Sequence, residues 1–225
     1  GSTFKVITLA ASLEEKIVDL DKDMYHDSGA INVEGARIKC WKSGGHGTQT
    51  FMEVVQNSCN PGFVILGQRL GKEKLFSYIK KLGFGSKTGV DLNGESTGII
   101  FNLDNVGPVE LATTSFGQGV SVTPIQQITA VSAIVNGGTL YKPYIVKSVS
   151  EPETGSVILE NKPQIVRKVI SEDTSNKVRT ALENVVSLGS GRNAYIEGYR
   201  VAGKTGTAQK VENGKYLVNN YIMSF

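Results

Sequence analysis

The 225-residue chain begins with GSTFKVITLAASL at residues 1–13, in which a serine and a lysine three positions apart are followed by an apolar run. Residues three apart lie on one face of a helix, so the amino group of Lys5 can reach the hydroxyl of Ser2. Burial of such a helix lowers the pKa of its lysine, because burial disfavours the charged form. A neutral lysine can take the proton of a serine hydroxyl and make it a nucleophile. The stretch therefore predicts a buried helix that carries a nucleophile, Ser2, and its base, Lys5.

A serine that only caps a core helix is the other interpretation of such a string, and a second copy of the spacing illustrates it. Ser77 and Lys80 also lie three apart, inside an amphipathic stripe at 75–82 that predicts a helix with one apolar face. There the serine and the lysine are expected to face solvent. We therefore assign the nucleophile to Ser2 and not to Ser77.

The second informative string is SCN at residues 58–60, followed by Pro-Gly at 61–62. Residues 47–57 read as a short helix, and the proline and glycine then force a turn or a new helix start. Ser58 and Asn60 are expected on a tight loop between helices, where a hydroxyl and a carboxamide can be aimed at one point. By itself the string only indicates a turn, because Ser, Asn, Pro and Gly are common turn residues. It indicates a catalytic site only in combination with the other motifs.

The third string is KTG at 204–206, in a stretch at 198–211 that reads as a strand with small residues. Glycine in a strand permits close approach of another backbone, so an extended substrate can pair with this strand. A second KTG at 87–89 follows a glycine-rich helix exit and reads as a connecting loop. We expect Lys204 to be functional and Lys87 to be structural.

The remaining elements follow from local patterns. Thr123 precedes a proline in the way that typically starts a helix. The expected elements are short strands at 31–33 and 37–39, helices at 61–70, 72–82, 124–136 and 172–186, a hairpin of 140–150 with 156–159, and a strand at 216–223. Helices thus dominate between the first and third strings and strands dominate later, which predicts the α+β class.

Ser-x-x-Lys, Ser-x-Asn and Lys-Thr-Gly in this order are typical of penicillin-binding proteins and serine β-lactamases. Longer strings extend the match over nearly the whole chain: GSTFK at 1–5, NSCNP at 57–61, SFGQG at 115–119 with TP at 123–124, and GRNA at 191–194 leading to GYRVAGKTGTA at 198–208. On these residues the chain resembles the transpeptidase domain of class B penicillin-binding proteins, and most of all the division and sporulation type.

The resemblance implies a role for each catalytic position. Ser2 would be acylated by the penultimate D-alanine of a peptidoglycan stem peptide, and Lys5 would be the base for that attack. Ser58 would help to pass a proton to the leaving nitrogen, and Lys204 would contribute positive potential. A neighbouring stem peptide would then supply the amine that resolves the acyl-enzyme and leaves a cross-link.

The resemblance also implies the substrate contacts. Asn60 would hold the amide of the acyl group, while Thr205, Gly206 and Thr207 would bind the strand-like substrate, the two threonines at its carboxylate. The backbone N–H groups of Ser2 and Thr207 would form the oxyanion hole, which typically contributes a few kcal/mol to the transition state. A β-lactam antibiotic mimics the D-Ala-D-Ala end and would trap Ser2.

The same resemblance implies the penicillin-binding-protein and serine β-lactamase-like fold, a helical subdomain with an antiparallel sheet. Residues 1–225 are expected to be a fragment of one transpeptidase domain, incomplete at both ends. An N-terminal anchor absent from the chain would hold the protein at the extracytoplasmic face of the bacterial membrane, and other cell-wall synthesis proteins would dock on missing regions. The strand at 216–223 would then be an exposed edge, so impaired catalysis and self-association are expected.

Composition excludes several other classes of function. The net charge of +3 comes from mixed signs without a basic block, so no nucleic-acid partner is expected. No stretch of about 18 apolar residues is present, so no membrane span is expected. Neither His26 nor His46 stands in a ligand set with metal spacing, so no metal or other cofactor is expected, and His46 is expected in a loop.

Cys40 and Cys59 are open to two interpretations. Unpaired cysteines are usually small buried hydrophobes. However, Cys59 lies inside the second motif, and disulfides persist outside the cytoplasm, where the resemblance places the protein. A bond between the two cysteines would tether the loop of Ser58 and Asn60, so they are a possible redox pair whose oxidised form is slow or inactive.

Three rival functions share some of these motifs. A class A-type β-lactamase needs a carboxylate for its deacylating water, commonly in Glu-x-x-Asn, and the chain has no such string. A D,D-carboxypeptidase shares all three motifs and differs in using water as the acceptor. A β-lactam-sensing or scaffolding domain that binds without turnover also keeps them. Transpeptidase is the interpretation that we favour.

Overall fold

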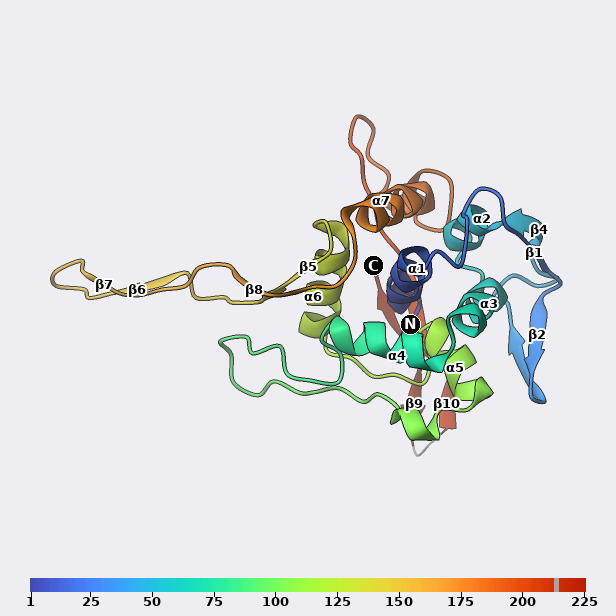
Figure 1. Cartoon of the computed structure of the whole chain (residues 1–225), viewed down its shortest axis with the longest axis horizontal. Helices are drawn as coiled ribbons and strands as arrows, with labels where there is room; N and C mark the ends of the chain where they lie inside the picture. The colour runs from blue at the N-terminus through green and yellow to red at the C-terminus, as the bar shows by residue number, and fades with distance from the viewer. Residues whose placement is uncertain (213–214) are drawn as a thin grey trace.

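The computed structural model describes residues 1–212 and 215–225. Its first long helix lies in the middle of a cluster of helices, and a long hairpin arm projects from one side of this cluster (Figure 1). The last two strands pair with each other, and the first of them contacts the N-terminal segment (Figure 1). Both ends of the described chain thus contribute to the same region of the molecule.

Helices form the bulk of the core. The α-helices among the described residues are α1 (Lys5–Glu14), α2 (Phe51–Gln56), α3 (Asn60–Leu70), α4 (Lys72–Lys81), α5 (Pro108–Ser115), α6 (Pro124–Val135) and α7 (Glu172–Ser187). They are accompanied by the short 3-10 helices η1 (Ser2–Phe4), η2 (Leu103–Asn105) and η3 (Arg192–Ala194). The expected helices after residue 60 are confirmed, and Thr123 and Ser171 cap α6 and α7 as their side chains accept backbone N–H groups.

The strands pair in twos, and every pair is antiparallel. The strands are β1 (Met24–Asp27), β2 (Ala30–Val33), β3 (Ala36–Lys39), β4 (Gly47–Thr50), β5 (Thr139–Lys142), β6 (Ser148–Ser150), β7 (Val157–Glu160), β8 (Gln164–Lys168), β9 (Gly206–Glu212) and β10 (Lys215–Ser224). The pairs are β1 with β4, β2 with β3, β5 with β8, β6 with β7, and β9 with β10. The α+β class is confirmed, while the β5–β8 pair at the root of the hairpin arm was not predicted.

The helix predicted over 47–57 was wrong in its first four residues. These form β4, which pairs with β1, and the helix begins only at Phe51. Thr50 is the N-cap: its hydroxyl accepts from the backbone N–H of Glu53 (3.2 Å), and the Glu53 carboxylate accepts from the N–H of Thr50 (2.7 Å). This reciprocal pair is a capping box, which fixes the helix start.

The α1 helix is buried on all sides, as its apolar run predicts. Residues 5–13 are all buried, because α3, α4, α6 and α7 pack around the helix. The ring of Phe4 lies 5.2 Å from that of Phe84, and the Thr8 hydroxyl donates to the carbonyl of Ser115 (2.8 Å). Such a helix is a rigid base for the residues at its N-terminal end.

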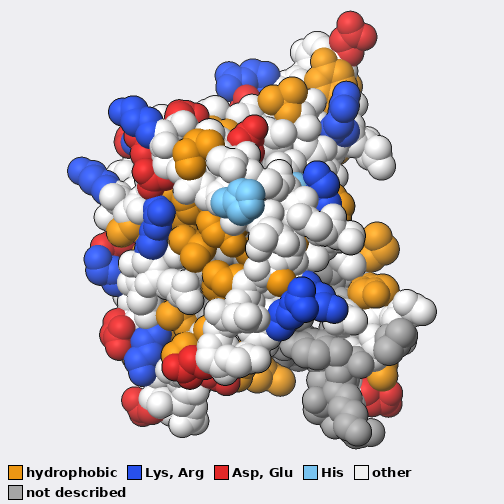
Figure 2. Space-filling model, turned by 90° about the vertical axis from the view of Figure 1, so that its right-hand side faces the viewer, with side chains coloured by type: hydrophobic (Ala, Val, Ile, Leu, Met, Phe, Trp, Pro, Cys, Tyr) orange, Lys and Arg blue, Asp and Glu red, His pale blue; other side chains and the backbone are white. Residues whose placement is uncertain are grey.

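Charged side chains of both signs are scattered over the face shown in Figure 2, around an exposed apolar area. This distribution agrees with the mixed charges of the sequence. None of the helices in the described part of the chain has both the length and the apolar character needed to cross a membrane.

Candidate active site

Ser2 lies at the very start of the helical segment, in η1, and is partly accessible. Two glycines let other segments approach it closely. A Cβ on Gly206 would lie 3.2 Å from the backbone nitrogen of Thr3, and a Cβ on Gly117, whose φ is +84°, would overlap the carbonyl oxygen of Gly1. The backbone of β9 and the loop after α5 therefore pack directly against the segment that carries Ser2.

Lys5 is the hub of the site, with 1% of its surface exposed. Its amino group donates to the carbonyl of Ser58 (2.8 Å), to the hydroxyl of Ser58 (3.1 Å) and to the Oδ1 atom of Asn60 (2.7 Å). A charged lysine has three protons for these three acceptors, and a neutral lysine has two. Loss of one proton therefore releases one contact and frees a lone pair of Nζ.

Ser58 links Lys5 to Lys204. The backbone of Ser58 has a φ of +53°, which is uncommon for a residue other than glycine and aims both its carbonyl and its hydroxyl at Lys5. Lys204 Nζ donates to the same hydroxyl oxygen at 2.7 Å and to the carbonyl of Thr205 at 3.0 Å. A serine hydroxyl has two acceptor lone pairs, and both are used here, so its own proton remains available to a third partner.

Burial tunes the two lysines. It lowers the pKa of Lys5 well below the ordinary 10.5, and the positive charge of Lys204 lowers it further. Burial also lowers the pKa of Lys204, to about 8. Lys5 is thus suited to act as a neutral base, while Lys204 remains mainly charged near neutral pH.

The third motif lies at the start of β9. The strand predicted over 198–211 was wrong for its first part, because β9 begins at Gly206, and Lys204 and Thr205 precede it in irregular backbone. This places Lys204 where its side chain turns inward and is 5% exposed, while Thr207 on the strand stays exposed. Thr205 Oγ1 lies 3.2 Å from the hydroxyl of Ser190. The sequence did not predict this contact, although Ser190 directly precedes the GRNA string at 191–194.

The structure brings together Lys5, Ser58, Asn60 and Lys204 through hydrogen bonds and places β9 against η1. In the described part of the chain, no hydrogen bond joins the Ser2 hydroxyl to this group. Ser2 therefore lies beside this group, but a contact between its hydroxyl and the amino group of Lys5 stays a prediction.

The second copies of the motifs lie outside this group. Ser77 and Lys80 are on α4, with Lys80 exposed. Lys87 lies in irregular backbone, where the Thr88 hydroxyl and N–H both contact the Glu95 carboxylate. The assignment of these copies to structural roles agrees with their places in the fold.

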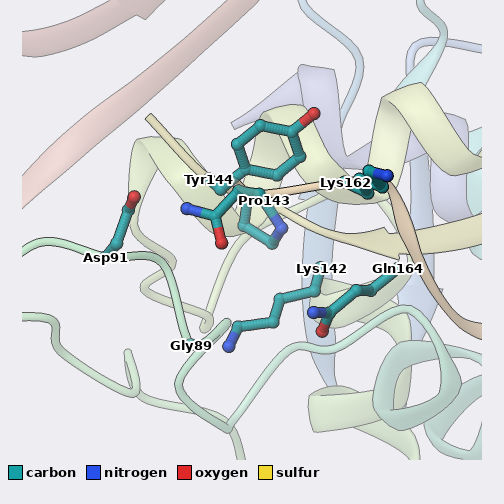
Figure 3. Close-up of a pocket in the computed structure, with 8 residues that line it drawn as sticks. Gly89, Asp91, Lys142, Pro143, Tyr144, Lys162 and Gln164 are labelled. Atoms are coloured by element: carbon teal, nitrogen blue, oxygen red, sulfur yellow. The ribbon is translucent and has the colours of Figure 1, made fainter. Parts of the chain in front are cut away.

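A pocket with a volume of about 40 Å³ lies near the root of the hairpin arm (Figure 3). It is lined by residues of the 89–91 loop and of the β5 and β8 region, among them Asp91, Lys142 and Gln164. Asp91 accepts the backbone N–H groups of Ile145 and Val146 (2.7 and 2.9 Å), so this carboxylate holds the arm in place. The residues predicted for catalysis do not line this pocket.

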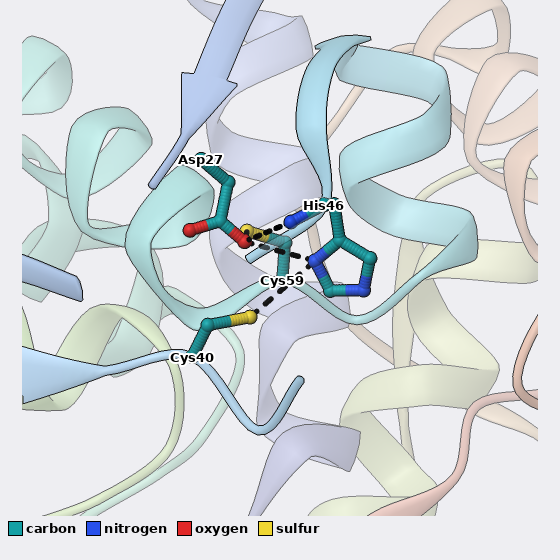
Figure 4. A group of neighbouring side chains, drawn as sticks. All are labelled: Asp27, Cys40, His46 and Cys59. Atoms are coloured by element: carbon teal, nitrogen blue, oxygen red, sulfur yellow. Dashed lines mark hydrogen bonds and ion pairs between the residues drawn. The ribbon is translucent and has the colours of Figure 1, made fainter. Parts of the chain in front are cut away.

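A second cluster, formed by Asp27, Cys40, His46 and Cys59, is drawn in Figure 4 and includes the middle residue of the Ser58–Asn60 turn. Its donor atoms all lie within 4.8 Å of one another, so the expectation that no such ligand set exists was wrong. The residues come from the end of β1, the 40–46 loop and the turn before α3, and their spacing in the sequence does not predict the cluster. Both cysteines are free and buried, and His46 is in a loop as expected.

A serine at a helix start, beside two buried lysines that share a second serine hydroxyl, is typical of serine acyltransferases with a lysine base. Comparison with known proteins identifies the family: the chain belongs to the penicillin binding protein transpeptidase domain family, whose model matches residues 1–225. This confirms the resemblance found in the sequence.

Individual relatives agree with this family. The chain is 66% identical over 225 residues to stage V sporulation protein D of Bacillus subtilis, covering 100% of the chain and 35% of that protein. It is 32% identical over 237 residues to PbpB of Mycolicibacterium smegmatis, covering 100% of the chain and 36% of that protein. The chain thus spans about a third of the length of these curated relatives.

Solved structures share the fold as well. The crystal structure of penicillin binding protein 3 from Mycobacterium tuberculosis in complex with aztreonam superposes with a TM-score of 0.91 at 32% identity, covering 99% of this chain and 51% of that one. The transpeptidase domain of Burkholderia pseudomallei penicillin-binding protein 3 superposes with a TM-score of 0.86 at 30% identity, covering 98% of this chain and 63% of that one. The expected fold is therefore confirmed.

Proposed function

We propose that this chain carries the acyl-transfer centre of a peptidoglycan D,D-transpeptidase, with Ser2 as the nucleophile. The observation that carries the proposal is the single hydroxyl of Ser58 held between Lys5 (3.1 Å) and Lys204 (2.7 Å). Several similar proteins are named peptidoglycan D,D-transpeptidases. Solved structures of a further similar protein, penicillin binding protein 3 from Mycobacterium tuberculosis, contain aztreonam or ampicillin. Stem peptides and β-lactams are the ligands that this proposal assigns to the site.

The acylation step follows from these contacts. Neutral Lys5 takes the proton of Ser2, and the Ser2 oxygen forms a bond to the carbonyl carbon of the penultimate D-alanine. The carbon–nitrogen bond to the terminal D-alanine breaks, and the departing nitrogen takes the free proton of the Ser58 hydroxyl. The charged Lys5 then returns a proton to Ser58 through their existing hydrogen bond, and the ester on Ser2 remains.

Deacylation reverses the proton path. An amine of a second stem peptide gives a proton to the lysine and serine relay and attacks the ester carbon. The bond to Ser2 breaks, Ser2 regains a proton, and a new amide cross-links the two peptides. Thr205, just before β9, and Thr207, on β9, are the proposed contacts of the substrate carboxylate. Lys5 holds Oδ1 of Asn60, and Nδ2 of Asn60 donates one N–H to the carbonyl of Lys39 (3.3 Å), so its second amide N–H remains for the acyl group.

The proposal includes a location. Peptidoglycan is outside the cytoplasm, so we place the site at the extracytoplasmic face of the membrane, with the anchor and the docking regions for other cell-wall proteins in parts that this chain does not contain. The domain limits and the self-association expected from the sequence stay predictions.

The test is acylation by benzylpenicillin, followed as intact mass. We expect one adduct on the protein, loss of that adduct in Ser2→Ala, and retention in the matched control Ser77→Ala, which alters the second copy of the motif. An adduct that persists in Ser2→Ala would refute the assignment. Product analysis with a stem peptide and an acceptor amine then separates cross-linking from hydrolysis to a carboxypeptidase product or from a stable acyl-enzyme without turnover.

A further inference from the structure

The chemistry described above does not use the cluster of Asp27, Cys40, His46 and Cys59. One of its members, Cys59, is nevertheless the sequence neighbour of both Ser58 and Asn60. Asp27 ends β1, Cys40 directly follows β3, His46 precedes β4 in its loop, and Cys59 is the N-cap residue of α3. Three segments, namely the end of β1, the 40–46 loop and the turn before α3, are thus joined at one buried point. We infer that this point is a binding site for a thiophilic divalent cation of the zinc type.

The donor set and the geometry both support this inference. Two sulfurs, one imidazole nitrogen and one carboxylate oxygen make up the kind of four-ligand set that binds zinc. His46 Nδ1 lies 2.9 Å from Asp27 Oδ2 and 3.4 Å from Cys40 Sγ, and Cys59 Sγ lies 3.3 Å from Asp27 Oδ2. Around a tetrahedral zinc, such pairs are separated by about 3.3 to 3.8 Å, from bond lengths of about 2.0 to 2.3 Å. These three separations are thus within about half an ångström of the tetrahedral values, and all the ligand atoms lie within 4.8 Å of one another.

Burial favours a closed site. The side chains of Asp27 and His46 are 0% and 6% exposed, and Cys59 is 0% exposed. Figure 4 shows the four side chains pointing toward one another from different segments. Four protein ligands without an open position are typical of a structural zinc site and not of a catalytic one. Calcium and magnesium prefer six or more oxygen ligands, and here one side chain supplies oxygen.

Binding has a defined proton balance. Zinc binds to two thiolates, so each bound ion displaces the protons of Cys40 and Cys59 to the buffer, while Asp27 and His46 supply lone pairs. No electron is transferred. The same ion excludes a disulfide between these cysteines, because both sulfurs are then occupied.

The site would brace the catalytic turn, a consequence that rests on the proposed function. Cys59 is flanked by Ser58 and Asn60, which are the acceptors of Lys5. An ion on Cys59 ties this turn to β1 and to the 40–46 loop. Zinc would thus hold the left-handed backbone of Ser58 in the conformation that presents both its oxygens to Lys5.

The inference is tested by metal titration of the reduced, chelator-treated protein. We expect one equivalent of Zn²⁺ to bind with release of about two protons, and Co²⁺ to give the intense thiolate and tetrahedral absorption bands. Mg²⁺ should not compete. Cys40→Ser and Asp27→Asn should each weaken Zn²⁺ binding by about 100-fold or more, the upper end of the cost of losing even an outer-shell partner. The matched control is His26→Ala, since His26 is exposed and bonded to Thr48.

A second measurement needs no variant and so does not depend on the folding of one. Zn²⁺ should slow alkylation of both cysteines by iodoacetamide at least tenfold in the unaltered protein. Unchanged alkylation, an octahedral Co²⁺ spectrum, or equal Zn²⁺ affinity in the unaltered protein and Cys40→Ser would each overturn the inference. None of these readouts involves acylation of Ser2, so the metal site can fail while the proposed function stands, and the reverse.

Discussion

The pH dependence of Ser2 acylation is the sharpest consequence of the two buried lysines. Acylation requires Lys5 without its proton and Lys204 with it. The rate constant should therefore rise with pH through the depressed pKa of Lys5 and fall again through the pKa of Lys204, which burial lowers to about 8. The profile should be bell-shaped, with its alkaline limb more than two pH units below that of an ordinary lysine.

The fall in rate on the alkaline limb follows from the pKa of Lys204. With a pKa of about 8, Lys204 is charged in roughly nine molecules of ten at pH 7, in about one of ten at pH 9, and in about one of a hundred at pH 10. The acylation rate constant should fall by these factors. A depression of this size means that burial destabilises the charged form, relative to the neutral form, by roughly 3 kcal/mol more than water does.

The assay is the second-order rate constant for a fluorescent penicillin, measured from pH 5 to 10 under reducing conditions. Lys204→Arg keeps a charge at every pH used and should remove the alkaline limb, whatever its effect on the absolute rate. Burial and then the charge of Lys204 depress the pKa of Lys5; Lys204→Gln removes the second cause and should move the acid limb to higher pH. Lys87→Arg is the matched control and should leave both limbs in place.

Two results would refute the reasoning. One is a rate constant that stays flat between pH 7 and 10, which would mean that the charge of Lys204 is not needed. The other is an alkaline limb near pH 8 that survives in Lys204→Arg, which would assign the limb to another group.

Three further predictions concern the turn, the packing at Ser2 and the cysteines. Ser58→Ala removes the hydroxyl shared by both lysines, so acylation should fall by about 10² to 10⁴, while Ser77→Ala should be neutral; an unchanged rate in Ser58→Ala would contradict the proton relay. Gly117→Ala should lower the melting temperature and the acylation rate more than Gly155→Ala, because both positions have positive φ but a Cβ has free space at Gly155 alone of the two; equal effects would show that the contact with Gly1 is unimportant. Oxidation of the metal-free protein should join Cys40 to Cys59 and slow acylation, and equal rates in verified oxidised and reduced samples would remove the redox prediction.

The sequence alone predicted most of the site because each motif stands in a recognisable local setting. The apolar run after Lys5 indicates a buried helix, which is found. The Pro-Gly pair after Asn60 indicates a turn or a new helix start, and the structure has the helix start, with Asn60 as the first residue of α3. The sequence therefore predicts that four side chains lie close together in the candidate site, those of Lys5, Ser58, Asn60 and Lys204.

Other features depended on signals that were overlooked or are not local. Thr50 and Glu53 form a capping box that the sequence contains, and its recognition would have placed the helix start correctly. By contrast, the strand pairing of β5 with β8 spans the whole hairpin arm, and no local pattern fixes it. No local pattern predicts the ligand set around Asp27 either, because tertiary packing of three chain segments creates it.

The hydrogen bond between Lys204 and Ser58 also bears on how the protein folds, because it joins residues 146 positions apart. Closing so long a loop costs entropy before any contact in the site can offset it, so we expect this contact to form late in folding. Lys5 and Ser58, by comparison, are 53 positions apart. Lys5 begins α1, and Ser58 lies in the turn just before α3, which packs against α1. A nascent or partly folded chain would therefore contain Ser2 and Lys5 without the charge of Lys204 beside them. Covalent labelling by a penicillin would then report completed folding of the chain and not the mere presence of its nucleophile.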